Sequence, residues 1–266
     1  MLYKKKWPLI IFLIPGFIMM LVFLFMPFIE NIKLSLYDMT AVVQMPGQEF
    51  KYIGLENYKN MFIDPKIRIA IVNSLKMMGL TVVFQVGFAL VLAILVDTVK
   101  RGQQFFRIVY FFPIVISATA IGLIFQLFYN YKGGMLNQLL ELFDKKPINW
   151  LAPSIAFFMI SIPTLWSYVG FYFVILLTGI NGISDDVYEA AAIDGCSKFK
   201  QVFYITLPLL RGVICTCVTL AVTGALKVFD LPWAIAPKGA PQGLTHFLGT
   251  YMYEQTFTIS NYDYGS

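Results

Sequence analysis

The sequence predicts an all-α protein that crosses a membrane several times. The chain of 266 residues is 58% hydrophobic and 13% charged, whereas a soluble domain has about 25% charged residues. Long apolar runs without charges recur along it, separated by shorter polar segments. Most of the surface is therefore expected to face lipid, and residues 1–266 are predicted to form a single transmembrane domain.

Five apolar runs are long enough to span a bilayer. A spanning helix needs about 20 mostly apolar residues, because the hydrocarbon layer is about 30 Å thick and each helical residue rises about 1.5 Å. The predicted spans are residues 7–29, 77–96, 108–131, 156–180 and 207–229. In the last span, Arg211 is expected to snorkel to the interface. The first run could also be a secretory signal peptide, but it exceeds a usual signal core and no small-residue cleavage site follows.

Lysine and arginine predict the orientation of these spans. With the N-terminus in the cytoplasm, the inside segments are short and dense in basic residues, beginning with Lys4, Lys5 and Lys6 and continuing with Lys100 and Arg101. The longer connections, residues 30–76, 131–153 and 230–266, then lie outside. They are either surface for an external partner or plain linkers.

Several classes of function are disfavoured by composition. The net charge of +5 is spread among the loops, whereas a nucleic-acid-binding protein needs a clustered basic face. A single histidine, His246, and the absence of metal-ligand spacing predict no metal site. The three cysteines, Cys196, Cys215 and Cys217, are read as free thiols. The G-x-x-x-x-G-K-[ST] loop that cradles phosphates does not occur, so the chain is not expected to hydrolyse ATP.

A polar segment between the fourth and fifth spans, residues 184–208, has the pattern of two short helices. Ser184 suits an N-cap, and Asp185 and Asp186 follow it in the first turn, where carboxylates favour the helix dipole. Gly195 suits the left-handed position that ends a helix. A second helix is expected from Lys198 to Leu207, with Pro208 as the boundary to the next span. Such a projection suits docking to another protein, and an ordinary amphipathic loop is the alternative.

This segment resembles the EAA loop in the permease subunits of binding-protein-dependent ABC importers. The matching positions are Glu189, Ala190, Ala191, Gly195, Ile205, Leu207 and Pro208. Three further stretches are similar to the sugar-type permeases, namely "YIGLENYKNMF" before "DP", "GGMLNQLL" and the final "YDYGS". The resemblance is closest to permeases for oligosaccharides and glycerol phosphate derivatives, and it covers most of the chain.

The resemblance implies the type I (MetI-like) ABC importer permease fold in a bacterial-type cytoplasmic membrane. The loop would be the coupling helix that docks on an ATPase, with Asp194 beside the matching residues. Implied partners are a second permease subunit with a different sequence, two ATPase subunits and an external binding protein that delivers a carbohydrate-type solute. ATP and Mg²⁺ would bind the ATPase, and this chain would hold no cofactor. The paired permeases would work by alternating access.

Two other classes of function remain open at this stage, an ion-coupled secondary transporter and a membrane scaffold. A secondary transporter usually places acidic or histidine side chains inside its spans. Here the predicted spans contain no acidic residue, and Asp97 and Asp230 lie at span ends. The EAA-type pattern argues against a scaffold.

Polar and aromatic residues within the spans are candidates for the solute path. They are Gln85, Gln126, Ser161, Thr164, Trp166, Tyr168, Tyr172, Thr216, Thr219 and Thr223. The three threonines of the fifth span share one helical face with Lys227, and Trp166 and Tyr172 offer rings that stack on sugars. Helix–helix packing is the alternative role, because hydroxyl groups commonly bond between membrane helices.

A sixth membrane helix is expected after Ser266. Five spans and a cytoplasmic N-terminus put Ser266 outside, whereas the family that the chain resembles returns its C-terminus to the cytoplasm. Residues 251–266 hold few aliphatic side chains and include Glu254 and Asp263, so they cannot form this span. A natural five-span protein is the alternative.

Overall fold

The structure is a computed structural model that describes residues 7–39, 50–99 and 102–266. The described chain divides into two compact units. Unit 1 contains the chain up to Asp64 and the segment from Met252 to Ser266, and unit 2 contains Pro65–Tyr251. The basic residues Lys4, Lys5, Lys6, Lys100 and Arg101, used above to predict orientation, lie outside the described residues.

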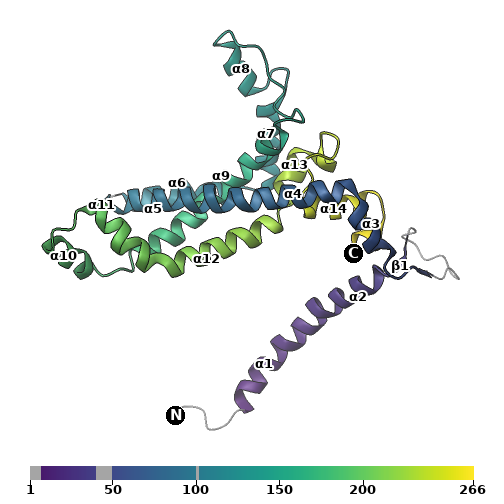
Figure 1. The fold of residues 1–266 in the computed structure, drawn as a ribbon, viewed down its shortest axis with the longest axis horizontal. Coiled ribbons are helices and arrows are strands. Elements are labelled where there is room, and N and C mark those ends of the chain that lie inside the picture. Colours follow the sequence, from purple (N-terminus) through teal and green to yellow (C-terminus); the bar gives the residue numbers. More distant parts are fainter. Residues whose placement is uncertain (1–6, 40–49, 100–101) are drawn as a thin grey trace. The chain divides into compact units, whose positions relative to one another are not determined.

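Unit 1 begins with one long apolar helix, purple in Figure 1. It consists of α1 (Trp7–Met20), a π-helical turn η1 (Leu21–Phe25) and α2 (Met26–Leu34). The described side chains of α1 and η1 are exposed to the outside of the unit. The helix extends beyond the predicted span of residues 7–29 to Leu34, and Glu30 and Lys33 form an exposed ion pair of 2.7 Å near its end.

The rest of unit 1 is a small polar assembly. A two-residue antiparallel pair joins β1 (Tyr37–Asp38) to β2 (Lys51–Tyr52), and the helices are α3 (Glu56–Ile63), η5 (Glu254–Thr258) and α15 (Tyr262–Gly265). Asn57 Nδ2 donates to Asp263 Oδ2 at 3.1 Å, and the Tyr264 hydroxyl donates to Asp64 Oδ2 at 2.9 Å. Burial and this carboxylate raise the pKa of Tyr264. The C-terminal segment is thereby fixed to the polar segment around α3.

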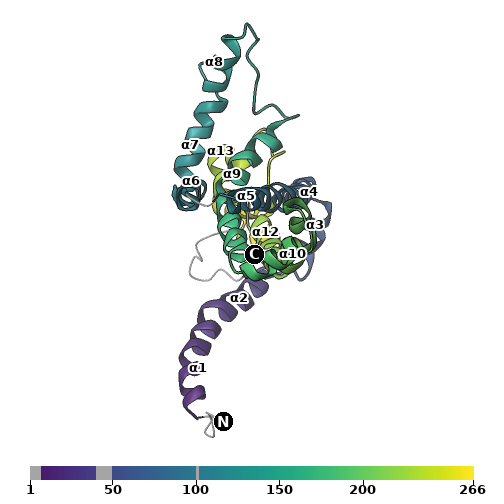
Figure 2. The same cartoon turned by 90° about the vertical axis from the view of Figure 1, so that its left-hand side faces the viewer.

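Unit 2 is a bundle of long helices with two projections. Its long helices are α4 (Pro65–Leu80), η2 (Thr81–Val86), α5 (Gly87–Asp97), α6 (Gln103–Val115), α7 (Ala118–Tyr129), α9 (Ala156–Ile180) and α12 (Leu207–Leu226). Its short elements are α8 (Met135–Glu141), α10 (Asp185–Ile193), α11 (Lys198–Gln201), η3 (Val202–Thr206), α13 (Asp230–Ile235), η4 (Pro237–Gly239) and α14 (Leu248–Tyr253). Figures 1 and 2 show α8 at the tip of one projection and α10 at the end of the bundle.

Four helices in the described residues are long and apolar enough to cross a membrane, and a fifth crossing results if one bent pair counts as a span. The four are Leu9–Leu34, Pro65–Asp97, Ala156–Ile180 and Lys198–Ile235. The predicted range 156–180 coincides with α9. The second helix begins twelve residues before the predicted 77–96, at Pro65, because charges such as Lys66 and Arg68 end an apolar run without ending a helix.

The predicted span over residues 108–131 is not one straight helix in the structure. The chain turns by 88° between α6 and α7. Ile116 and Ser117 have extended backbones at this break, with ψ angles of 139° and 133°. Pro113 lacks an N–H and so removes a hydrogen bond from the last turns of α6. Sequence patterning missed the break because no charge interrupts the apolar run.

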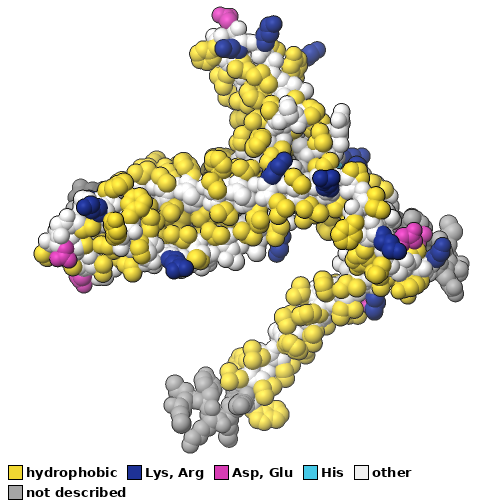
Figure 3. Space-filling model, viewed as in Figure 1, with side chains coloured by type: hydrophobic (Ala, Val, Ile, Leu, Met, Phe, Trp, Pro, Cys, Tyr) yellow, Lys and Arg dark blue, Asp and Glu magenta, His cyan; other side chains and the backbone are white. Residues whose placement is uncertain are grey.

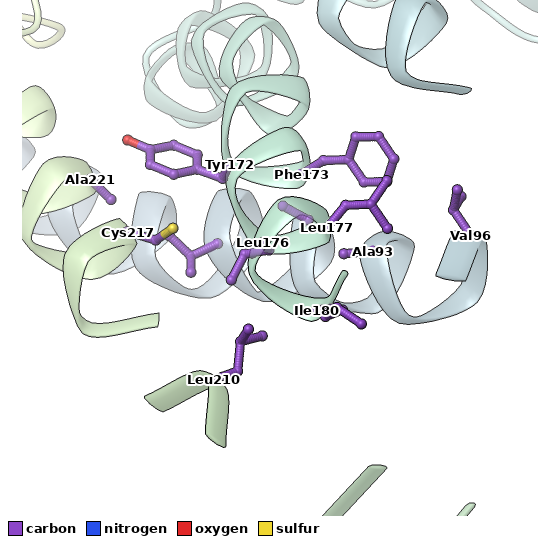
Figure 4. Packing of buried hydrophobic residues seen from close by; sticks show 12 residues of the cluster. Ala93, Val96, Tyr172, Phe173, Leu176, Leu177, Ile180, Leu210, Cys217 and Ala221 are labelled. Atoms are coloured by element: carbon purple, nitrogen blue, oxygen red, sulfur yellow. The ribbon is translucent and has the colours of Figure 1, made fainter. Parts of the chain in front are cut away.

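The core of the bundle is formed by α9 packed between α5, α6 and α12. Figure 4 shows Leu176 and Leu177 of α9 between Ala93 on one side and Cys217 on the other. Small residues permit close helix approach in membrane proteins. At Gly170 the backbone of α9 lies so close to the Tyr110 carbonyl of α6 that a Cβ at this position would overlap it. The two helices are therefore in direct backbone contact.

The surface of the long helices is mainly apolar. Figure 3 shows hydrophobic side chains over most of the visible face of α5 and α12, with acidic side chains at the α10 end and at the tip of α8. Exposed phenylalanines and leucines such as Phe88, Leu95 and Leu209 contribute to this surface. A band of this kind is what lipid or another apolar helix covers.

Candidate functional site

The first candidate site is the hairpin formed by residues 184–201, which contains α10 and α11. Ser184 caps α10, since its Oγ accepts from the Asp186 N–H at 3.4 Å. The other end is closed by two hydrogen bonds, Gly195 N–H to Ala192 O at 3.1 Å and Cys196 N–H to Ala191 O at 2.9 Å. Gly195 has φ +76°, so the predicted left-handed glycine turn is confirmed. This bond pattern is the Schellman motif.

One glutamine holds the two arms of the hairpin together. Gln201 Nε2 donates to the carbonyls of Tyr188, at 3.3 Å, and Cys196, at 3.2 Å. The Tyr188 hydroxyl is also 3.0 Å from Thr206 Oγ1. These bonds fix α10 to the start of the following helix. Sequence reasoning did not identify Gln201 or Tyr188, because their partners are backbone carbonyls and a residue on the other arm.

The outer face of the hairpin is open. Glu189, Ala190, Asp194 and Gly195 are exposed, and Ala191 is half-buried. Ile193, which was not among the predicted residues, is 87% exposed. A large apolar side chain beside an acidic residue, on a face that nothing in the described chain covers, is typical of a surface that another protein contacts.

Pro208 lies at the predicted boundary with the next span, although the chain stays helical across it. After α11 the chain continues through η3 into α12, and Pro208 lies within the first turn of α12. In η3 the Leu207 N–H bonds to Val202 O, five residues earlier. This wider turn precedes the proline, whose ring would otherwise meet the carbonyl four residues back. Of the remaining predicted loop residues, Ile205 and Leu207 are half-buried and Pro208 is exposed.

A polar cavity of about 490 Å³ separates the hairpin from the ends of α5 and α9. Its lining includes Asp97, Asn181, Asp185, Lys198 and Gln201. The hairpin is therefore joined to the bundle mainly through the chain segments that enter α9 and α12. This arrangement leaves its outer face free for contact.

The second candidate site is a cavity of about 300 Å³ inside the bundle, called here the central cavity. Residues of η2, α9, α12 and α13 line it, together with the first residue of α7. The lining residues are Thr81, Gln85, Ala118, Thr164, Tyr168, Phe171, Tyr172, Leu220, Gly224, Ala225, Lys227, Val228, Phe229, Asp230, Leu231 and Pro232. Its volume is at the lower end of the range for small-molecule sites, about 300–1,000 Å³.

Four of the predicted path residues line the central cavity, namely Gln85, Thr164, Tyr168 and Tyr172. The structure brings them together from η2 and α9. Gln85 is buried and its Nε2 donates to the Thr164 carbonyl at 3.0 Å. The Thr164 hydroxyl is buried and has no hydrogen-bond partner among the described residues.

The other predicted path residues lie elsewhere. Ser161 is buried and donates to Phe157 O at 2.7 Å, and Trp166 packs beside Phe125 with ring centroids 6.1 Å apart. Gln126 holds α7 to α13 through the Ala234 carbonyl, at 2.7 Å. The three threonines of α12, Thr216, Thr219 and Thr223, are exposed. The hydroxyl of each donates to the backbone carbonyl four residues earlier.

Two helix interruptions meet at the central cavity. Ala118 follows the α6–α7 break, and residues 227–229 separate α12 from α13. A third lining residue, Thr164, is next to Pro163 within the continuous helix α9. Interrupted backbone at membrane depth is tolerated where it is buried in protein or lines a water-filled cavity. The two breaks therefore lie where the bundle holds an internal cavity.

A tyrosine compensates for the proline in α9. Pro163 has no N–H, so the Met159 carbonyl lacks its helical donor. The Tyr129 hydroxyl of α7 donates to this carbonyl at 2.8 Å. This bond keeps α9 continuous beside the cavity.

An apolar helical bundle with an internal cavity, and a capped polar hairpin between two of its spans, is an arrangement expected of a membrane transport subunit. The chain belongs to the family of binding-protein-dependent transport system inner membrane components, whose profile matches residues 85–260. It is thus a multi-pass inner-membrane component, and this family is one of permease subunits, not of enzymes. Membership removes the ion-coupled transporter and the scaffold as classes of function.

Curated relatives are similar over almost the whole chain. The probable ABC transporter permease protein YurN of Bacillus subtilis is 34% identical, with 96% of this chain and 87% of the relative covered. The trehalose/maltose transport system permease protein MalF of Thermococcus litoralis is 28% identical, with 96% and 84% covered. The arabinooligosaccharides transport system permease protein AraP of Bacillus subtilis is 26% identical, with 99% and 83% covered.

A solved structure has the same fold. A chain of a bacterial ABC transporter that imports the acidic polysaccharide alginate superimposes with a TM-score of 0.82 and 23% identity, covering 98% of this chain and 88% of that chain. The predicted resemblance to ABC importer permeases and the predicted fold class are confirmed.

Proposed function

We propose that the chain is a membrane subunit of an ATP-driven importer that moves a carbohydrate-type solute from an external binding protein into the cytoplasm. The observation that carries the proposal is family membership over a region that contains the hairpin and every lining residue of the central cavity except Thr81. Relatives named for trehalose/maltose and for arabinooligosaccharides support a saccharide as solute.

The hairpin is proposed to dock on a cytoplasmic ATPase through Glu189, Ala190, Ala191, Asp194 and Gly195. Its open outer face and its fixed Schellman turn support this role, because a preformed surface loses less entropy on binding. The sequence holds no phosphate-binding loop, so ATP and Mg²⁺ are assigned to the ATPase subunits and no cofactor to this chain. A second permease, of a different sequence, completes the assembly, and the N-terminus is cytoplasmic.

The central cavity is proposed as part of the solute path. Tyr168 and Tyr172 offer aromatic rings, and the free Thr164 hydroxyl offers a hydrogen bond. Binding in this cavity would alternate between the two sides of the membrane as ATP binding closes the ATPase subunits.

The test is uptake by the complete importer in proteoliposomes, with radiolabelled maltotriose, xylotriose and arabinotriose as probes. We expect saccharide uptake that requires ATP and the binding protein and persists with a protonophore. Uptake that collapses with the protonophore, or that proceeds without ATP, contradicts the proposal.

A matched pair of variants tests the cavity. Gly224 lines it, and a Cβ there meets no atom within 4 Å. Gly212 is in the same helix and has equally open surroundings, but it does not line the cavity. We expect Gly224→Leu to fill the cavity and to reduce uptake at least about tenfold, a change that needs only about 1.4 kcal/mol. Gly212→Leu should leave uptake within about twofold of the wild type. Equal effects of the two variants would show that the central cavity is not part of the solute path.

A further inference from the structure

Two side chains of opposite charge line the central cavity. One belongs to Lys227, which the sequence placed on the threonine face of the fifth span, and the other belongs to Asp230, which was not among the predicted path residues. Lys227 ends α12 and Asp230 begins α13, on either side of the helix break. Both are exposed, and within the described residues no ion pair within 4.0 Å engages either one. They are the only charged residues in the described lining, whose formal charge is therefore zero.

Local electrostatics explains the sign of each charge but not their common position. A cation is favourable at the C-terminus of a helix and an anion at the N-terminus. Lys227 and Asp230 meet these preferences for α12 and α13. Both nevertheless line the same cavity next to the apolar helix α12, and ionisable residues that face the interior of a membrane bundle mark functional sites. Together they supply a strong donor and a strong acceptor a few residues apart.

The chemistry of this pair distinguishes between classes of saccharide. A uronate or another acidic sugar would pair with Lys227 but would be repelled by Asp230. An uncharged ring uses both side chains, because its hydroxyls accept from the ammonium group and donate to the carboxylate. The Thr164 hydroxyl, buried and without a partner among the described residues, adds a third polar contact. Tyr168 and Tyr172 offer aromatic faces for the apolar side of the ring.

We propose that Lys227 and Asp230 are specificity-determining residues that select an uncharged polyhydroxylated ring over an acidic one. This inference rests on the proposed function of the central cavity. It goes beyond that function by naming the charge class of the solute and the two residues that discriminate between charged and uncharged solutes.

The transport experiment compares neutral and acidic probes in the complete importer. The probes are radiolabelled maltotriose, xylotriose and arabinotriose, and the trimers of galacturonate and mannuronate. We expect the wild type to prefer a neutral probe. Asp230→Asn leaves the cavity with a net positive charge, so the acidic-to-neutral uptake ratio is expected to rise roughly tenfold, and Lys227→Gln is expected to lower it. Lys227→Arg and Asp230→Glu keep the charges and should retain the wild-type ratio, whereas a role in helix capping alone would leave all ratios unchanged.

A second measurement reads the charge of the cavity without transport. Gly224→Cys, in a background without the three native cysteines, places a thiol in the cavity. We expect the labelling ratio of an anionic to a cationic methanethiosulfonate to rise with Asp230→Asn and to fall with Lys227→Gln. A wild type that prefers uronates, or ratios that neither substitution changes, would overturn the inference. If no saccharide enters in an ATP-dependent way, the proposed function fails, while the labelling ratios still decide whether the two charges control the cavity.

Discussion

Replacement of Gly195 by alanine tests whether the shape of the hairpin carries its docking function. A Cβ at Gly195 meets no atom within 4 Å, so the substitution introduces no clash. Its effect comes from φ +76°, a left-handed conformation that costs an L-residue with a side chain about 1–2 kcal/mol relative to the right-handed one. If the ATPase binds only the Schellman form, this energy lowers docking affinity by roughly 5- to 30-fold. Asparagine, which tolerates this region better, should lie between glycine and alanine.

The assay is the affinity of the purified ATPase subunit for the permease pair in nanodiscs, with ATPase stimulation as a second readout. Gly195→Pro should abolish docking while the spans still insert, because proline requires a negative φ and removes the N–H that bonds Ala192 O at 3.1 Å. Gly212→Ala is the control, since its site in α12 is helical and equally open, and it should be neutral. Wild-type affinity in Gly195→Ala would refute the reasoning.

Three further outcomes are expected. Tyr129→Phe removes the hydroxyl that donates to the Met159 carbonyl at 2.8 Å. It should lower the free energy of unfolding of the detergent-solubilised subunit by roughly 0.6–1.5 kcal/mol, measured by reversible unfolding. An unchanged or raised stability would show that water or another group replaces the bond. Thr219→Val keeps the shape of an exposed α12 side chain and is expected to change uptake selectivity if this face borders the path as predicted, whereas a change in stability alone would assign it to packing. Cys196 should react with a membrane-impermeant maleimide in inside-out vesicles and not in intact cells, and the opposite result would reverse the proposed orientation.

The parts of the structure that depend on local chemistry could be predicted from sequence. Ser184 and Gly195 bound α10 as expected, because capping bonds involve neighbours within a few residues. The helix that contains residues 156–180 could be predicted because its apolar run and its helical segment end together. For the helix that begins at Pro65 they do not, since lysine and arginine end an apolar run but are good helix formers.

The composition of the central cavity could not be predicted, because it depends on how separate helices meet. The threonine stripe of α12 has the right period, but Leu220 and Gly224 of that helix line the cavity instead. Asp230 was predicted to be a span end, since sequence alone does not show that the helix breaks before this residue and that it lines the cavity. Gln126 has a polar side chain at membrane depth for a different reason, since it bonds the Ala234 carbonyl of α13 at 2.7 Å.

The position of α12 has a mechanical consequence. This helix is joined to the hairpin through η3. It runs for 20 residues to Leu226, next to Lys227 on the central cavity, so it is a stiff rod about 30 Å long. A tilt of about 10° about its hairpin end displaces its cavity end by about 5 Å, roughly the rise of one helical turn. A small rotation imposed at the hairpin is thereby converted into a displacement large enough to open or close a space the size of a sugar ring.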